Sequence, residues 1–271
     1  MDFRTIVDIP RPPFAIGALE DMLFVGSCFA DNIGKRFVEE KFHAVVNPYG
    51  VMYNPASVLH TVSRFAAERG ATMPSTAFFT LGTSHVYRLR ETGEIVDNCR
   101  KRPQRLFQEE VLGVDACRQY LQEAVDMLAS LNPEVRVVVT VSPIRYAKYG
   151  YHGSQLSKST LLLAADALVR DNSRCAYFPA YEIVQDELRD YRFYQPDMTH
   201  PSEQAVDYIY ERFCEAYLSD EAKEFLREWR PIKAALAHRP FNPSSAEYQA
   251  FMEETRRKAD RLEARYPGLK I

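Results

Sequence analysis

Short apolar runs alternate with stretches of helical periodicity over most of this 271-residue chain, and this alternation constrains the fold more than any other feature. The runs have the composition of buried strands and cover residues 22–26, 43–50, 77–83, 135–143 and part of 174–184. Helical spacing of apolar side chains covers residues 29–42, 115–131, 155–170 and 202–217. Strands that alternate with helices predict a parallel sheet covered on both faces, which is a three-layer α/β/α fold.

The pattern changes near residue 216. Two highly charged, helix-prone segments follow, separated by the break HRPFNPSS at residues 238–245. The sequence therefore predicts two parts, an α/β domain over residues 1–215 and a helical C-terminal extension over residues 216–271.

Composition excludes several classes of function. Hydrophobic residues make up 46% of the chain and charged residues 26%, with a net charge of -3, which argues against a nucleic-acid partner. No apolar run is long enough to span a membrane, and the N-terminus lacks a signal pattern, so we expect no membrane association. The five cysteines are widely spaced and never form CxxC, which predicts a reducing, cytoplasmic location and no zinc site or other cofactor.

Two motifs carry the chemistry. In a parallel sheet, ligands bind beyond the carboxyl ends of the strands, and Ser27 directly follows the first strand. Asp197 and His200 occupy one loop before a helix, where the carboxylate can orient the imidazole as the base for a serine nucleophile. A free Ser27 N–H at the helix start would stabilise an oxyanion. Either motif alone has a structural alternative, because Gly-Ser commonly caps a helix and Asp197 could cap the next one.

The pentapeptide GSCFA at residues 26–30 is the signature of GSCFA-domain proteins, and the blocks NPYGVMYNP, LGTSHVY, TVSPIRY and DMTHPS also resemble that family. The resemblance covers roughly residues 5–245. GSCFA proteins are in turn similar to the SGNH, or GDSL-type, hydrolases, which implies a flavodoxin-like sheet and a Ser-His-Asp triad.

The resemblance also implies roles for particular residues. It makes Ser27 the nucleophile, His200 the base and Asp197 the acid, with Gly50 contributing an N–H to the oxyanion hole. The asparagine that SGNH proteins use as a further donor is missing from residues 82–85. Ser84 or Asn98 is expected in its place.

The adjacent Cys28 is a competing nucleophile. Successive residues of a helix point about 100° apart, so Ser27 and Cys28 cannot both face one base. The resemblance favours Ser27 and predicts that Cys28 points toward the core. His85, Arg145 and His152 follow strands and are expected to contact substrate, although a mobile polar loop would also explain Arg145 and its neighbours.

The sequence thus predicts a serine hydrolase of SGNH type that cleaves a small acyl or acetyl ester of a small molecule or glycan. Two alternatives remain open. The same residues could transfer the acyl group to a sugar hydroxyl, since the acceptor depends on whether water is kept out. The missing asparagine could instead indicate a binding or scaffold protein with weak chemistry.

Overall fold

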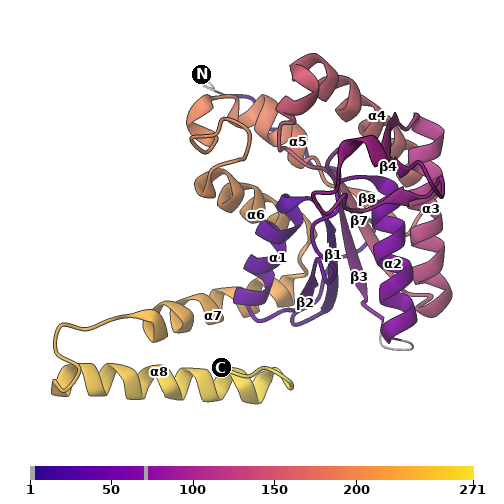
Figure 1. Cartoon of the computed structure of the whole chain (residues 1–271). Coiled ribbons are helices and arrows are strands. Elements are labelled where there is room, and N and C mark those ends of the chain that lie inside the picture. The colour runs from indigo at the N-terminus through magenta and orange to yellow at the C-terminus, as the bar shows by residue number, and fades with distance from the viewer. Residues whose placement is uncertain (1–3, 70–72) are drawn as a thin grey trace.

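A computed structural model, which describes residues 4–69 and 73–271, contains a five-stranded parallel sheet in the order β2-β1-β3-β7-β8 (Figure 1). The strands are β1 (Asp21–Gly26), β2 (His43–Val46), β3 (Thr76–Leu81), β7 (Arg136–Val141) and β8 (Cys175–Tyr177). Counted along the chain, the five parallel strands have the order 2-1-3-4-5, which is the flavodoxin-like order. The predicted α/β fold is confirmed.

Alternate residues of each strand face opposite layers. In β1, Met22 and Phe24 belong to one buried cluster, whereas Leu23 and Val25 belong to the other. Helices on both sides bury these faces (Figure 1), which explains why the strands are apolar at nearly every position. One face is covered by α1 (Cys28–Glu39) and α6 (Glu203–Tyr217), and the other by α2 (Pro55–Arg69), α3 (Val114–Leu131) and α4 (Gly150–Asp171).

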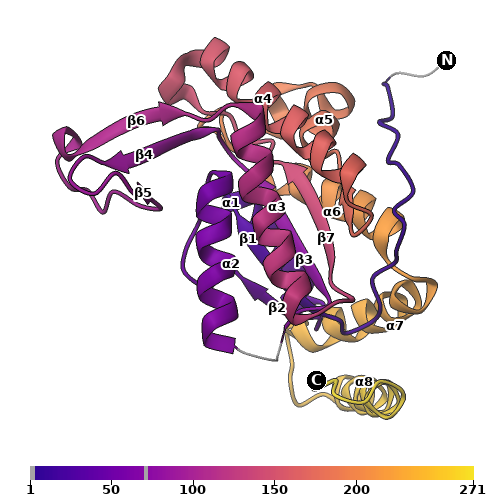
Figure 2. The same ribbon diagram turned by 90° about the vertical axis from the view of Figure 1, so that its right-hand side faces the viewer.

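A small antiparallel sheet is inserted between β3 and α3. Its strands, in the order β5-β4-β6, are β4 (His85–Leu89), β5 (Ile95–Val96) and β6 (Phe107–Val111), and they project from the main sheet in Figure 2. We did not predict this sheet or α2. The inserted strands are short, β4 is mostly half-buried and β6 carries exposed polar side chains, so they lack the continuous apolar runs of the parallel strands.

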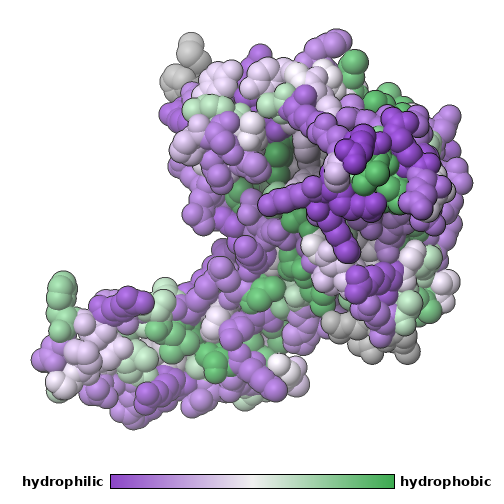
Figure 3. Space-filling model, viewed as in Figure 1, coloured by the Kyte–Doolittle hydropathy of each residue, from purple (hydrophilic) through white to green (hydrophobic). Residues whose placement is uncertain are grey.

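The C-terminal helices form a hairpin that stands away from the body (Figure 1). Helices α7 (Asp220–Ala237) and α8 (Ala246–Arg265) are separated at the predicted break, residues 238–245. Much of the hairpin surface is hydrophilic in Figure 3, although Phe225 and Trp229 of α7 join the cluster that also contains α1 residues. The helical C-terminal extension is confirmed, while a domain boundary at residues 215/216 stays a prediction.

Short helical turns follow the last two parallel strands. They are η2 (Ala147–Tyr149) after β7, and α5 (Ala180–Glu182), the π-helical η3 (Ile183–Leu188) and η4 (Tyr191–Phe193) after β8. A further turn, η1 (Gln104–Leu106), lies in the inserted sheet directly before β6. Within the described ranges, no helix combines the length and the apolar character needed to cross a membrane.

Candidate active site

The turn from β1 to α1 is tightly bound to β3. A Cβ atom on Gly26 would lie 2.2 Å from the Thr80 carbonyl oxygen, so only glycine fits there. Ser27 is 0% exposed, and its Oγ accepts a hydrogen bond from Phe29 N (3.2 Å) and shares one with Thr80 Oγ1 (3.1 Å). Its N–H donates to Thr80 O (3.1 Å) and Oγ1 (2.9 Å). The prediction of a free Ser27 N–H is therefore wrong, and the hydroxyl has the contacts of a helix cap.

Cys28, the first residue of α1, is partly exposed. Cys28 also packs against the buried cluster that contains Phe29 and Ile33 of α1, so the prediction that its side chain points toward the core holds only in part. Cys28 Sγ lies 4.0 Å from Tyr53 Oη. Within residues 4–69 and 73–271, the Cys28 N–H meets no hydrogen-bond acceptor outside α1. This turn thus presents a thiol and an available N–H, not the serine hydroxyl.

Tyr53 places a hydroxyl beside the thiol. Burial, with a contribution from neighbouring Cys28, raises the pKa of Tyr53 to about 12. The phenol therefore keeps its proton at neutral pH and can donate a hydrogen bond. Its ring meets the ring of Tyr146 edge-on, with centroids 6.0 Å apart.

The loop before α6 forms the predicted carboxylate–imidazole pair. Asp197 Oδ2 lies 2.6 Å from His200 Nδ1, and Oδ1 accepts hydrogen bonds from Thr199 N (2.8 Å) and His200 N (3.0 Å). These backbone and ring hydrogen bonds hold the pKa of Asp197 well below its usual range. An ionised carboxylate only accepts hydrogen bonds, so the proton of the neutral ring sits on Nδ1 and leaves Nε2 as a base.

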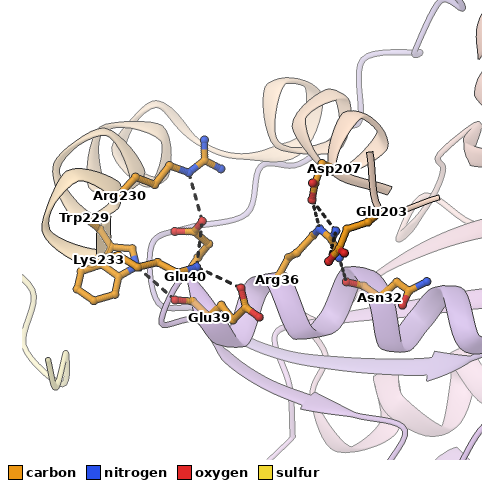
Figure 4. Close-up of polar contacts among 9 residues, drawn as sticks. All are labelled: Asn32, Arg36, Glu39, Glu40, Glu203, Asp207, Trp229, Arg230 and Lys233. Atoms are coloured by element: carbon orange, nitrogen blue, oxygen red, sulfur yellow. Dashed lines mark hydrogen bonds and ion pairs between the residues drawn. The ribbon is translucent and has the colours of Figure 1, made fainter. Parts of the chain in front are cut away.

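Helix α6 lies beside α1, and Figure 4 shows the side chain that joins them. Arg36 of α1 forms ion pairs with Asp207 (2.5 Å) and Glu203 (4.0 Å) of α6 and donates to Asn32 O (3.0 Å). Arg145, in the loop that follows β7, donates through its N to Thr199 O (3.0 Å), so the His200 loop lies at the carboxyl edge of the parallel sheet, where α1 also begins. In the described part of the chain, however, no hydrogen bond joins His200 to Ser27 or Cys28. The predicted Ser27–His200 hydrogen bond is absent.

Two of the other expected oxyanion donors, Gly50 and Ser84, are already occupied. Gly50 N donates to Asn47 O (2.9 Å). Ser84 is 0% exposed, and its N and Oγ both bind Ser157 Oγ. Asn98 is exposed, and its Oδ1 accepts from Arg100 N (2.7 Å) within its own turn. The Gly50 and Ser84 contacts do not favour these residues as oxyanion donors, and Asn98 follows β5 of the inserted sheet, outside the parallel sheet.

The expected substrate-contacting residues have different surroundings. His85 stacks on Tyr149 at 3.6 Å and lies 3.1 Å from Glu109, so it anchors the inserted sheet to η2. His152 is exposed on α4. Arg145 lines a pocket of about 250 Å³ at the end of β7, and its N donates to Thr199 O (3.0 Å) of the His200 loop. The structure thus brings Arg145, and neither histidine, to this pocket.

Sequence reasoning missed Tyr53 and Lys158. Lys158 is 2% exposed and donates to Gly82 O (2.8 Å) and Ser142 O (2.6 Å) at the ends of β3 and β7. The burial of Lys158 could have been predicted from helical spacing, because Lys158, Leu161 and Ala165 lie on the same buried face of α4. Nothing local marked Tyr53, which follows an irregular loop. The described residues contain no cluster of three potential metal ligands.

Comparison with known families agrees with the motifs. A model of the GSCFA family matches residues 21–74 and 67–213. The chain belongs to the GSCFA family. A model described as GSCFA domain protein, C-terminal domain, matches residues 229–271, which include α8. No curated protein matched this GSCFA protein.

Solved structures with similar folds include several esterases. An Axe2 mutant, an acetyl-xylooligosaccharide esterase from Geobacillus stearmophilus, has 12% identity over 75% of this chain and 96% of that one, with a TM-score of 0.46. A family 3 carbohydrate esterase from Clostridium thermocellum has 10% identity over 79% and 99%, with a TM-score of 0.43. At this low sequence identity, the similarity is limited to the general fold.

Proposed function

We propose that this GSCFA protein is an acyl-ester hydrolase in which Cys28 is the nucleophile and His200, oriented by Asp197, is the base. One observation carries the proposal. A partly exposed thiol begins α1 at the same edge of the sheet as an imidazole whose Nδ1 lies 2.6 Å from a carboxylate. A thiol, an imidazole and a carboxylate form a complete set for nucleophilic catalysis.

The reaction takes two steps. His200 Nε2 removes the proton of the Cys28 thiol, and the sulfur attacks the acyl carbonyl carbon. The ester C–O bond breaks, and the alcohol leaves with the proton from His200. Water, deprotonated by His200, then attacks the thioester, which releases the carboxylic acid and returns the proton to the sulfur.

Two donors support the oxyanion in this scheme. The Cys28 N–H is available at the N-terminus of α1, where the helix dipole also favours negative charge. Tyr53 Oη lies 4.0 Å from Cys28 Sγ and is protonated at neutral pH. A tyrosine hydroxyl is a known type of oxyanion donor, and here it would take the place of the missing asparagine.

The absence of a Cys28–His200 hydrogen bond is compatible with this scheme, because catalytic hydrogen bonds are often long until substrate binds. The SGNH resemblance and the flavodoxin-like strand order both support an active site at the carboxyl edge of the parallel sheet. A thiol nucleophile also fits the reducing, cytoplasmic compartment expected from the cysteine pattern.

Acyl-enzyme trapping tests the proposal. The full chain is incubated with 4-nitrophenyl acetate, rapidly acidified and digested, and the acetylated residue is identified by mass spectrometry. We expect the acetyl group on Cys28 and a loss of turnover of at least about 10²-fold in Cys28→Ala. Cys99→Ala is the matched control, since Cys99 is also a free, partly exposed cysteine. An unchanged rate in Cys28→Ala, or an acetyl group on Ser27, contradicts the proposal.

The fate of the acyl group separates hydrolysis from transfer. With an oligosaccharide present, free acetate as the sole product supports hydrolysis. Acetylated oligosaccharide that depends on Cys28 would show that a sugar hydroxyl replaces water in the second step. No acyl-enzyme and no turnover across a panel of esters would favour the binding or scaffold alternative.

A further inference from the structure

A pocket of about 250 Å³ opens beside the proposed reaction centre. It lies between the loop after β7, the first two turns of α4, and the segment that contains η3 and η4. One wall is the π-helical η3, a rare conformation that is often found at functional sites. Tyrosine rings dominate the lining, with Tyr151, Tyr181, Tyr191 and Tyr194 contributing.

Arg145 brings a positive charge to this pocket. Its guanidinium lies 4.2 Å from the ring centre of Tyr151 and 5.5 Å from that of Tyr194. Nη1 donates to Met198 O (2.9 Å), and within the described ranges no carboxylate forms an ion pair with Arg145. A guanidinium has five N–H donors in a planar fork that matches carboxylate and phosphate groups. Most of these donors remain available to a ligand.

Lys158 supplies a second cationic group to the lining. Its Nζ is fixed by the Gly82 and Ser142 carbonyl oxygens, and burial lowers its pKa to about 7. A nearby anion would favour the protonated lysine. The acidic residue of the lining, Asp190, already accepts a hydrogen bond from Arg192 N (2.9 Å) and pairs with the Arg192 side chain (3.6 Å). With Asp190 paired to Arg192, Arg145 and Arg189 give the lining a net positive charge even when Lys158 is neutral.

We propose that this pocket binds an anionic group, a carboxylate or a phosphate, on the ester substrate. The inference rests on the proposed function and names its substrate class, anionic esters. Arg145 N and Nη1 bind the carbonyl oxygens of Thr199 and Met198, the two residues before His200. An anion held by Arg145 would therefore lie next to the loop that carries the base, with its aromatic or sugar portion against the tyrosine rings.

Direct binding tests the pocket without any turnover. Isothermal titration calorimetry of the full chain uses 4-hydroxybenzoate and phenyl phosphate as anionic probes, which separate carboxylate from phosphate, and 4-hydroxybenzyl alcohol as the neutral probe. We expect at least one anion to bind about 10-fold or more tightly than the alcohol, and Arg145→Gln to remove that advantage. Arg145→Lys keeps the charge and should retain part of it. Arg170→Gln is the control, because Arg170 is an exposed arginine farther along α4.

Kinetics provide the second measurement. The ratio of kcat/KM for 4-acetoxybenzoate to that for phenyl acetate should fall about 10-fold or more in Arg145→Gln, mainly through KM for the anionic ester. Equal affinity for anionic and neutral probes, or a preference for anions that survives Arg145→Gln, overturns the inference. Arg145-dependent anion binding without hydrolysis of either ester would support the pocket and contradict the proposed function, so the two failures are distinguishable.

Discussion

Replacing Ser27 with alanine separates a structural role of this residue from a catalytic one. The hydroxyl accepts from Phe29 N and shares a hydrogen bond with Thr80 Oγ1 in a fully buried site. Loss of an N-cap side chain costs about 1 kcal/mol. Loss of the second hydrogen bond adds up to about 1 kcal/mol, since the Thr80 hydroxyl keeps the Ser27 N–H as a donor. Ser27→Ala should therefore lower the free energy of unfolding by about 1–2 kcal/mol.

Urea denaturation and calorimetry measure this effect. For a chain of this size, 1 kcal/mol corresponds to about 2–4 °C, so we expect Tm to fall by about 2–8 °C. Thr80→Val removes the same hydrogen bond from the other side, and the double variant should be less destabilised than the sum of the single variants. Ester turnover by the folded Ser27→Ala protein should remain within a few-fold of wild type. An unchanged Tm together with abolished turnover would refute this reasoning and make Ser27 the nucleophile.

Two further predictions concern charged groups. Asp197→Asn removes the carboxylate that orients His200, so kcat should fall by about 10²–10⁴-fold with little change in the circular dichroism spectrum. Asp220→Asn, at the start of α7, is the control. A kcat of Asp197→Asn within twofold of wild type would exclude the Asp197–His200 pair from catalysis. Burial lowers the pKa of Lys158 from 10.5 to about 7, so between these values the folded state binds fewer protons than the unfolded state. The stability of wild type relative to Lys158→Met should therefore rise with pH from about 7 to about 10, as measured by urea denaturation, whereas a difference that is constant with pH would show that Lys158 titrates normally.

Sequence predictions were accurate where the interactions join residues that are close in the chain, and they failed where the interactions join distant segments. The parallel strands were predictable because burial on both faces leaves continuous apolar runs, as in β1 and β7. The Asp197–His200 contact was predictable because three residues of one loop supply both side chains and the backbone donors. The inserted sheet was not predicted, because the pairing of β4 with β5 and β6 compensates for strands with few buried side chains.

The sequence by itself determined the α/β layers, the helical C-terminal extension and the family of this protein, since apolar periodicity and local motifs are properties of neighbouring residues. Only the tertiary structure decided which side chain at the start of α1 is accessible, because Ser27 is held inward by Thr80, a residue 53 positions away. The same holds for Lys158, whose burial depends on the ends of two strands meeting α4. Contacts between distant segments set the orientation and protonation of these groups, and a local pattern does not encode them.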